Sequence, residues 1–407
     1  MKRVVITGTS AVTALGDSWS AFSHGLRAEK NAVQVMPEWG FIDGMQTRLA
    51  APVTDFVVPS HYKRKKIRSM GRVSLMSTRA TEIALEAAGL LNTDTLTNGD
   101  TGIAYGSSTG STTPLKAFGN MMNTGEMSGV TATSYIQMMA HTAPVNIGVF
   151  FSVKGRIITT SSACTSGSQG IGYAYEAIKF GRQKVMIAGG AEELCATEAA
   201  VFDTLFATSL KNDTPELTPR PFDANRDGLV IGEGACTFIL EELTHAQARG
   251  AKILGEVVGF GCNSDGDHIT QPQSHMMERV MKDAMTDAGI DASDIGYVNA
   301  HGTATQIGDI AETTATKNAL GYKPISSLKS YLGHTLGACG AIEAWASINM
   351  MNDGWFAPTI NLNTLDEQCA DLDYLGSGGR KIDTGYVMSN NFAFGGINTS
   401  LILKRWH

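Results

Sequence analysis

The chain is poor in the residues that mark several common protein classes. Its six cysteines are scattered over 407 residues, with no C-x-x-C pair and no spacing typical of zinc ligands. Only 11 prolines are present, and no apolar run is long enough to span a membrane. Met1-Lys2-Arg3 is followed by just three apolar residues, too few for a signal peptide. We therefore expect a cytoplasmic globular protein without a metal centre.

Charge and loop composition exclude further classes. The net charge of −7 argues against general nucleic-acid binding. The Gly/Ser loop at residues 106–111 lacks the P-loop lysine and the spacing of a dinucleotide fingerprint, so it does not predict a phosphate site. Residues 223–228 resemble the start of an EF-hand loop, but Gly234 occupies the position of the closing bidentate glutamate. We therefore reject a calcium site there.

Strand-like apolar segments alternate with helical segments along the whole chain, and the alternation begins again near residue 250. The expected strands are residues 3–7, 101–105, 157–160, 184–190 and 232–240 in the first half, and residues 252–261, 295–300, 325–327, 386–389 and 400–403 in the second. Residues 11–16 are predicted as a helical turn, and residues 135–151 as one apolar helix. A helix rich in small residues lies near the centre of each half. The pattern predicts a duplicated α/β unit, divided as residues 1–250 and 251–407, and the apolar runs indicate parallel central strands buried on both faces.

One cysteine stands at the boundary between a strand and a helix. Cys164 follows the β-branched segment 157–160 and precedes a helical segment at 171–180. The free N–H groups and the positive dipole at a helix start favour a thiolate over a thiol. A single cysteine is more often a small buried apolar residue than a nucleophile. Its position nevertheless makes Cys164 a candidate nucleophile.

Two histidines and a glycine pair in the second half stand in comparable turns. His301 directly follows an expected strand, where open α/β sheets place their sites, and His334 precedes the second small-residue helix. Either histidine alone is more often structural, but two of them in glycine-flanked turns, together with Cys164, favour a catalytic site. Gly395-Gly396 lets the backbone approach a ligand closely, and the N–H groups beside it are suited to binding an oxyanion.

The densest group of positive charges is named the basic cluster here. It comprises Lys63, Arg64, Lys65, Lys66 and Arg68. On a chain of net charge −7, such a cluster is either a solvated face or a docking patch for an acidic partner. One short cluster without interleaved aromatic residues is a poor footprint for nucleic acid.

Four motifs together resemble the β-ketoacyl-[acyl-carrier-protein] synthases, the elongating ketosynthases. They are Ser-Ala-Cys164-Thr-Ser-Gly, His301-Gly-Thr-x-Thr-x-x-Gly-Asp-x-x-Glu312, Lys329-x-x-x-Gly-His334-x-x-Gly-Ala and Asn391-Phe-x-Phe-Gly-Gly-x-Asn. Their order along nearly the whole chain makes the resemblance specific. Residues 191–195, 212–216 and 365–368 are closer to the synthase I type.

The resemblance implies a fold, a reaction and partners. The implied fold is thiolase-like, with two similar α/β halves packed as a layered αβαβα core. The implied reaction is decarboxylative condensation of a cysteine-bound acyl chain with malonyl-carrier protein, without cofactor or metal. The expected partners are acyl- and malonyl-loaded acyl carrier protein, docked on the basic cluster, and a second subunit. That subunit would be a second copy of the chain or, in a heterodimer, a ketosynthase-like protein.

The resemblance also implies roles for single residues. Those implied in catalysis are Cys164, His301, His334 and Lys329, supported by Glu312 and Asp309. Those implied in holding the substrate or the pantetheine arm are Thr109, Phe202, Thr303, Thr305, Phe392 and Phe394. We expect Lys329 to pair with Glu312 and to order the His334 loop. The backbone N–H groups of Cys164 and Phe394 would form an oxyanion hole.

The chain also departs from the family pattern. The loop at residues 392–396 is called the gate loop, and in it Ala393 replaces a glycine. In addition, Ile397 replaces a polar residue, and Gln306-Ile307 stands where a proline is usual. Alanine does not adopt positive φ freely, so we expect an altered gate. These differences fit a specialised synthase, resembling those of aryl-polyene or other secondary-metabolite clusters, as well as fatty-acid synthesis.

Rival classes remain open at the level of the sequence. A thiolase would share the fold and the nucleophile, but it needs a second catalytic cysteine near the glycine loop, and residues 391–398 contain none. A partner subunit of the chain-length-factor type would lack the nucleophile that Cys164 supplies. A carrier-binding module without turnover is excluded only by assay.

Overall fold

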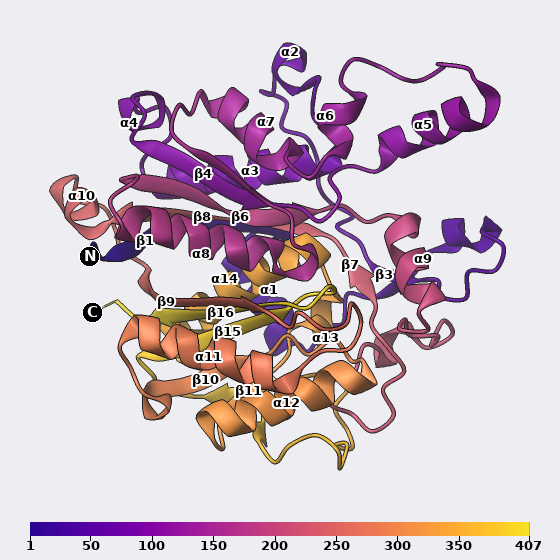
Figure 1. Cartoon of the computed structure of the whole chain (residues 1–407), viewed down its shortest axis with the longest axis vertical. Coiled ribbons are helices and arrows are strands. Elements are labelled where there is room, and N and C mark those ends of the chain that lie inside the picture. The colour runs from indigo at the N-terminus through magenta and orange to yellow at the C-terminus, as the bar shows by residue number, and fades with distance from the viewer. Residues whose placement is uncertain (407) are drawn as a thin grey trace.

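The computed structural model describes residues 1–406 and consists of two stacked α/β halves (Figure 1). The first half contributes to the main sheet the strands β1 (Val4–Thr13), β4 (Thr101–Gly106), β5 (Ile157–Thr160), β6 (Val185–Glu192) and β8 (Gly234–Glu242). The second half contributes β9 (Gly255–Ser264), β10 (Ile295–Asn299), β11 (Pro324–Ser326), β13 (Asp373–Tyr374), β15 (Tyr386–Phe392) and β16 (Ile397–Lys404).

Both halves have the same strand order. From the outer edge to the join, the first half runs β5-β4-β6-β8-β1 and the second runs β11-β10-β15-β16-β9, with β13 outside β11. In chain order, each half therefore places its third, second, fourth, fifth and first of these strands side by side. β1 pairs with β9 over residues 4–6, which joins the two sheets. The duplicated unit is confirmed, whereas a domain boundary at residue 250 stays a prediction.

The prediction of parallel strands is wrong for the part of the sheet nearest the join. β4 is parallel to β5 and β6, and β10 is parallel to β11 and β15. β8 and β16, by contrast, are antiparallel to both of their neighbours. A continuous apolar run reports that both faces of a strand are covered, and it carries no information about the direction of the next strand.

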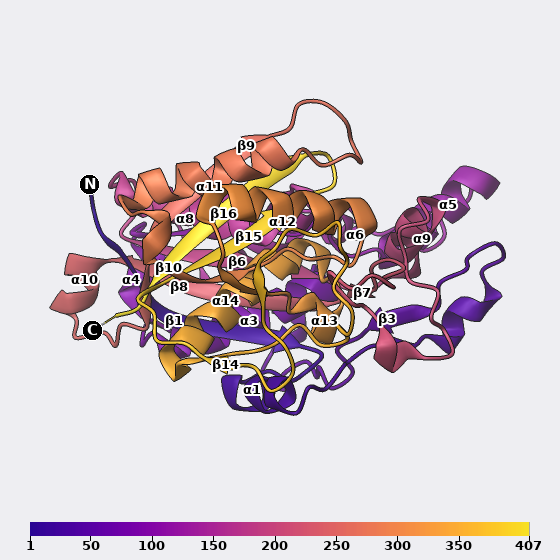
Figure 2. The ribbon, with the colours of Figure 1, turned by 90° about the horizontal axis from the view of Figure 1, so that it is seen from below.

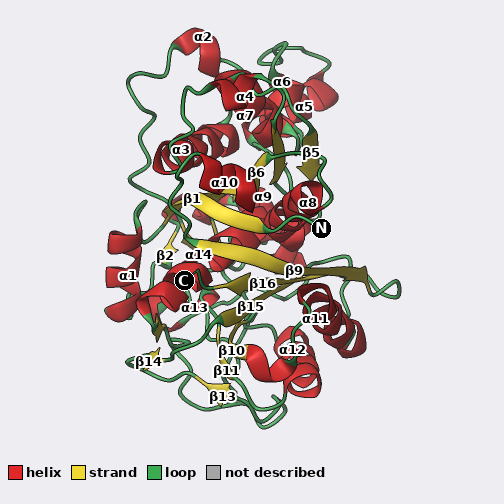
Figure 3. Ribbon diagram, turned by 90° about the vertical axis from the view of Figure 1, so that its left-hand side faces the viewer, coloured by secondary structure: helices red, strands yellow, loops and turns green. Residues whose placement is uncertain are grey.

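Helices form three layers around the two sheets (Figures 1 and 3). α3 (Arg72–Ala87) and α7 (Thr142–Phe151) pack on the outer face of the first sheet, while α8 (Ser166–Lys179) and α14 (Cys339–Asp353) lie between the halves and contact strands of both. α11 (Ser274–Ala288) and α12 (Gln306–Leu320) lie side by side on the outer face of the second half (Figure 2). The expected αβαβα layering is thus confirmed.

Small residues allow the central layer to form. A Cβ atom on Gly167 of α8 would lie 2.9 Å from the backbone nitrogen of Ala341 in α14. A Cβ atom on Gly170 would lie 2.6 Å from the carbonyl oxygen of Gly189 in β6. Contacts this short exclude larger side chains, so Gly167 sets how closely α8 approaches α14 of the second half, and Gly170 sets how closely α8 lies on β6.

Shorter elements complete the chain. The remaining helices are α1 (Trp19–Arg27), α2 (Arg64–Ile67), α4 (Asp94–Thr97), α5 (Thr113–Thr124), α6 (Ser134–Met138), α9 (Ala196–Thr204), α10 (Leu243–Ala248) and α13 (Lys329–Leu332). The 3-10 helices are η1 (Pro37–Phe41), η2 (Ala163–Thr165), η3 (Pro215–Leu217), η4 (Ala292–Asp294) and η5 (Leu336–Ala338). Two small sheets contain β2 (Gln34–Val35), β3 (Leu49–Ala51) and β7 (Ile231–Gly232), and β12 (Trp355–Phe356) and β14 (Arg380–Lys381).

Two predicted elements differ from the structure. The helical turn expected at residues 11–16 is wrong, because β1 continues to Thr13 and pairs there with β8. The single helix expected at residues 135–151 is two helices, α6 and α7, separated at Met139, whose backbone is extended. Pro144 lies in the first turn of α7, the one part of a helix that tolerates a residue without an N–H group. Of the helices in residues 1–406, none is both long and apolar enough to cross a membrane.

Candidate active site

Cys164 lies in a strained turn between β5 and α8. The turn is η2, and Ala163 enters it with φ of 49°, in the left-handed region that alanine seldom adopts. The second half has a counterpart in η5, which precedes α14 and which Leu336 enters with φ of 44°. Left-handed residues of this kind persist where tertiary contacts hold them, and they gather at functional sites. The surroundings of Cys164 therefore impose its position.

His334 contacts the thiol directly. Its Nε2 lies 3.0 Å from Sγ of Cys164, and its Nδ1 accepts a hydrogen bond from the backbone N–H of Leu336 at 3.2 Å. Because Nδ1 is an acceptor, the proton of the neutral ring is on Nε2. His334 consequently donates its Nε2–H toward the sulfur.

His301 has the same tautomer for a different reason. Its Nδ1 lies 3.2 Å from Nζ of Lys329 and 3.4 Å from Nδ2 of Asn391, and both of these atoms are donors. The ring proton is therefore on Nε2 here as well. The His301 and His334 rings are almost perpendicular, with centroids 5.1 Å apart. Burial and the charge of Lys329 hold the pKa of both histidines well below the ordinary value, so both rings are neutral at pH 7.

Lys329 does not pair with Glu312, so that prediction is wrong. Its ammonium group pairs with Glu343 of α14, and Asn391 donates to the other oxygen of the same carboxylate at 2.7 Å. Burial disfavours the charge of Lys329, but Glu343 outweighs it and raises the pKa of the lysine above its ordinary value. Lys329 thus orients His301, and it does not hold the His334 loop as expected.

Two carboxyl groups of α12 hold the loop that carries His301. Glu312 accepts the backbone N–H groups of His301 and Gly302, each at 2.7 Å, and burial raises the pKa of Glu312 to about 8. Asp309 accepts the backbone N–H of Phe222 at 2.8 Å and that of Ala304 at 3.2 Å. Both residues therefore act on the backbone of the loop, as supports for the ring.

The thiol of Cys164 is protonated in the resting site. Burial raises its pKa to about 11, although hydrogen bonds from the backbone N–H groups of Phe394 and Cys164 oppose this effect, as does the charge of Lys329. The expectation that the helix start favours a resting thiolate is wrong, because the turn is buried and His334 beside it carries no charge. The two N–H groups that reach the sulfur are those expected to form the oxyanion hole.

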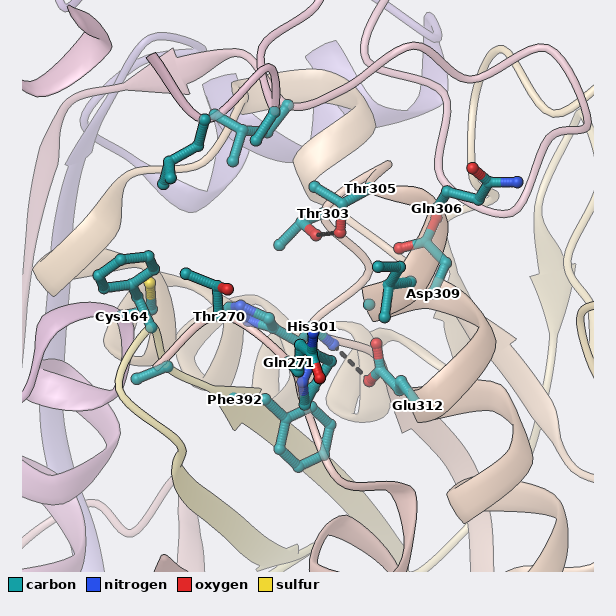
Figure 4. Close-up of a pocket in the computed structure, with 18 of the residues that line it drawn as sticks. Cys164, Thr270, Gln271, His301, Thr303, Thr305, Gln306, Asp309, Glu312 and Phe392 are labelled. Atoms are coloured by element: carbon teal, nitrogen blue, oxygen red, sulfur yellow. Dashed lines mark hydrogen bonds between the residues drawn. The ribbon is translucent and has the colours of Figure 1, made fainter. Parts of the chain in front are cut away.

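A cavity of about 500 Å³ opens onto this group (Figure 4). Of the site residues predicted from the sequence, those that line it are Cys164, Phe202, His301, Thr303, Thr305, Asp309, Glu312, His334, Phe392 and Phe394. The hydroxyls of Thr303 and Thr305 are 2.8 Å apart, and the rings of Phe202 and Phe394 meet edge to face at 6.3 Å. The structure thus brings residues from five separate segments to one cavity.

Some residues were misplaced or missed. Thr109 does not line the cavity, since its hydroxyl donates to Glu198 at 3.1 Å. The sequence reasoning missed Ile269, Thr270 and Gln271, which belong to a loop that lines the cavity beside the gate. No sequence signal marks that loop. Glu343 was also missed, although its place one turn from the start of the small-residue helix was a usable signal.

Ala393 fits the gate loop without strain. Positive φ angles in this loop occur at Gly395, with 94°, and at Gly396, with 76°, whereas Ala393 is not among the left-handed residues. The N–H of Gly395 donates to the carbonyl of Ile269 at 2.9 Å, which links the gate to the neighbouring loop that carries Ile269. The altered gate expected from Ala393 is therefore absent from the backbone of this conformation, and its effect on motion stays a prediction.

The spacing of the three reactive atoms bears on metal binding. Sγ of Cys164 and one nitrogen of each histidine lie within 4.8 Å of one another, a distance that a metal ion accepts. The ammonium group of Lys329 lies 3.2 Å behind His301 and opposes a dication at this point. Two N–H donors and a thiol favour an electron-rich oxygen as the bound group.

The two-fold repeat, the layering and the buried cysteine with two histidines define a class, that of proteins with the thiolase-like ketosynthase fold. Comparison with known proteins gives the family. The model of the β-ketoacyl synthase N-terminal domain matches residues 1–246, and that of the C-terminal domain matches residues 254–363. The chain belongs to the β-ketoacyl synthase family.

Individual relatives agree along the full length. The 3-oxoacyl-[acyl-carrier-protein] synthase 1 of Haemophilus influenzae is 39% identical, with 100% of each chain covered. A crystal structure of a β-ketoacyl synthase from Burkholderia phymatum is 58% identical, with a TM-score of 0.99 and 100% of both chains covered. The AntDE:AntF structure, a type II PKS acyl-carrier protein in complex with its ketosynthase, is 28% identical, with a TM-score of 0.88 and 100% of both chains covered.

Proposed function

We propose that the protein is a chain-elongating β-ketoacyl-acyl-carrier-protein synthase, which joins a Cys164-bound acyl chain to a malonyl unit with loss of CO2. The observation that carries this proposal is the contact of Cys164 Sγ with Nε2 of His334 at 3.0 Å, with His301 beside it in the same tautomer. Formation of a 3-oxoacyl-carrier product from acyl- and malonyl-carrier protein, followed by mass spectrometry, tests it.

The first half-reaction transfers the acyl group. The sulfur of Cys164 attacks the carbonyl carbon of the acyl thioester, and the carrier thiol leaves with the proton that the cysteine gives up. The N–H groups of Phe394 and Cys164 reach the sulfur in the resting site, which supports their role in binding the oxyanion of the tetrahedral intermediate. The product is a thioester on Cys164.

The second half-reaction forms the carbon–carbon bond. The Nε2–H groups of neutral His301 and His334 bind the thioester oxygen of the malonyl unit, and the C–C bond to its carboxylate breaks to release CO2. The enolate carbon then attacks the acyl carbonyl, and the Cys164 sulfur leaves and regains a proton. A donor of this kind contributes about 3 kcal/mol to a developing oxyanion, so two account for several orders of magnitude in rate.

We further propose that the basic cluster docks the acyl carrier protein. Its residues are exposed on and around α2, at the top of Figure 1, and none of them lines the cavity. Lys66 also packs on Phe150, since Nζ donates to the carbonyl of that residue at 3.2 Å and lies 5.2 Å from its ring centre. The ketosynthase complex described above supports a carrier partner for this chain.

Reversing four of these charges tests the dock. Glutamate at Lys63, Arg64, Lys65 and Arg68 should raise KM for carrier-bound substrates by about tenfold, because steering charges act on encounter. Lys66 is kept because of its packing. Rates with small pantetheine thioesters should stay unchanged, and added salt should bring the wild type toward the variant, since exposed pairs are screened over about 8–10 Å.

A matched control is available on the opposite face. Arg279 and Lys282 of α11 have exposed side chains, and their reversal to glutamate should leave KM for carrier-bound substrates unchanged. Equal losses with carrier-bound and free thioesters would show that the basic cluster supports the fold and does not dock a carrier.

The edge of the main sheet supports a dimer. β5 ends the sheet and pairs only with β4 among the described strands, and Ile157 on it is 44% exposed. An unpaired strand edge with apolar side chains favours pairing with another chain. We propose that a second copy pairs along β5, with a ketosynthase-like subunit as the alternative occupant.

Ile157→Lys should convert the dimer to a monomer of 43.2 kDa in sedimentation equilibrium, because the lysine would place a charge in a desolvated interface. Val57→Lys, at an apolar side chain that is 78% exposed, should not. A wild-type chain that is already monomeric when pure would contradict the homodimer and favour the heterodimer.

The pathway and the location stay predictions. Fatty-acid synthesis and secondary metabolism use the same condensation, and the acyl chains accepted by the pure enzyme would separate them.

A further inference from the structure

Glu192 is a fully buried carboxylate that the proposed reaction does not use. It is the last residue of β6 and accepts several hydrogen bonds from two other segments. Oε2 accepts the backbone N–H of Ser108 at 2.8 Å and that of Gly337 at 2.9 Å, and also the Ser108 hydroxyl. Oε1 accepts the hydroxyl of Ser107 at 2.7 Å. One side chain therefore ties three segments together.

Those segments lead to both reactive side chains. Gly337 lies in η5 next to Leu336, whose N–H group fixes the tautomer of His334. The carbonyl of Ser108 accepts the hydroxyl of Ser161, three residues before Cys164, at 3.3 Å. Glu192 is thus connected on one side to the turn that holds His334 and on the other to the turn that holds the thiol.

The packing at Gly337 leaves no room for a side chain. A Cβ atom on this glycine would lie 2.6 Å from Oε2 of Glu192 and 2.7 Å from the nitrogen of Ser108. Glycine is therefore required where η5 meets the carboxylate. A displacement of Glu192 would be transmitted to η5 because no space separates them.

Glu192 and the neighbouring Glu198 are both buried, and burial raises the pKa of each carboxyl group. The hydroxyl of Thr109 lies 3.1 Å from Glu198 and 3.5 Å from Glu192, and its single hydrogen serves only one of them. Burial raises the pKa of Glu198 well above the ordinary value, and its Oε2 has no partner in the described residues. Hydrogen bonds from Ser107, Ser108 and Gly337 oppose the effect of burial on Glu192, so of the two carboxyl groups it is Glu192 that keeps its charge.

We propose that Glu192 is a positioning residue of the condensation, and that its carboxylate holds the Cys164 turn and the His334 turn at reacting distance. This rests on the proposed function in one respect, namely that the reaction uses this thiol and this imidazole. Glu192 itself is not expected to touch the substrate, because it does not line the cavity.

Two substitutions separate the hydrogen bonds from the charge. Glu192→Gln can place its amide oxygen where Oε2 lies, which keeps the hydrogen bonds from the two backbone N–H groups. Its NH2 group then lies beside the Ser107 hydroxyl oxygen, which can accept a hydrogen bond from it. Glu192→Ala removes both the bonds and the charge. Glu193 is the matched control, because it is equally buried but accepts only from Thr112, at 2.7 Å and 2.8 Å, within residues 1–406.

Kinetics give the first readout. Glu192→Ala should lower kcat of condensation by about a hundredfold with KM nearly unchanged, because a misalignment of about 1 Å has that effect. Glu192→Gln should stay within about tenfold of wild type, since it keeps the backbone partners. Glu193→Ala should lower Tm without a comparable loss of kcat. Equal losses of kcat in Glu192→Ala and Glu193→Ala, or a Gln variant as damaged as the Ala variant, would overturn the proposal.

Thiol alkylation gives a second readout that requires no turnover. The charge of Glu192 raises the pKa of Cys164, so Glu192→Gln should alkylate faster with iodoacetamide at pH 8 than wild type, and Glu193→Gln should not. Of the charges that act on the thiol, Lys329 is unchanged in both variants. If Glu192→Gln alkylates faster than wild type but the wild type never condenses, the proposed function fails, whereas the effect of Glu192 on the Cys164 thiol is still supported. If Glu192→Ala does not fold, Glu192→Asp carries the kinetic test, with an expected loss between those of Ala and Gln.

Discussion

Cys164→Ala should abolish self-acylation of the protein, whereas incubation of the wild type with an acyl-thioester donor should add one acyl mass per chain. The reason is that Cys164 is the one cysteine lining the described cavity, where its sulfur meets two backbone N–H groups and Nε2–H of His334. Cys339 lies close by and donates to the carbonyl of Cys164 at 3.2 Å, but it does not line the cavity. The measurement is the intact mass of each variant.

The control for this experiment is a more accessible thiol. Cys262 is exposed, so Cys262→Ala should be acylated like wild type if position and not exposure selects the nucleophile. Cys164→Gln should act differently from Cys164→Ala, because its amide mimics the acyl-enzyme and leaves both histidines in place. It should still decarboxylate malonyl-carrier protein without forming a condensed product. Acyl mass that persists in Cys164→Ala would remove this cysteine from the mechanism.

His301→Ala and His334→Ala should each lose condensation by roughly 10²-fold or more while they keep measurable self-acylation. Each substitution removes one Nε2–H donor from the malonyl oxygen, and loss of one oxyanion donor has about this effect on kcat. His334→Ala should also slow acylation, since of the two histidines only His334 is hydrogen-bonded to the sulfur, at 3.0 Å. Release of CO2 from malonyl-carrier protein, measured in the Cys164→Gln background, isolates the step.

His268 provides the matched histidine. It lies in the cavity wall, and in the described residues its ring is bonded only to Thr270, so His268→Ala should condense at near wild-type rate. If His301→Ala and His334→Ala both condense at near wild-type rate, the assignment of the two imidazoles to decarboxylation is wrong.

Motifs in the sequence locate the reactive side chains but not their partners. Cys164, His301 and His334 each lie in a turn that is visible in the residue pattern, and the structure brings them together. The partner of Lys329 is not visible in this way, because Glu343 and Glu312 are both acidic residues on nearby helices and only tertiary packing selects between them. A motif fixes which residues are adjacent in the chain, whereas ion pairing depends on the approach of separate segments.

Strand direction and the state of the thiol are further examples. The alternation of strands and helices predicts the repeat, but the antiparallel position of β8 and β16 arises from connections that leave no periodic signal. Likewise, the start of a helix predicts a thiolate at Cys164 only when the turn is open to solvent. Its burial, which depends on α14 and the gate loop, reverses that expectation.

The equivalent turns η2 and η5 have different roles in the two halves of the chain. In each half, the turn before the central helix begins with a left-handed residue, Ala163 or Leu336. The residue that follows is Cys164 in the first half and Gly337 in the second. One corner therefore presents a sulfur atom to the substrate, and the equivalent corner admits the carboxylate of Glu192. A duplicated fold contains the same turn twice. A different residue at the equivalent position of each turn, Cys164 or Gly337, therefore gives the two turns different roles.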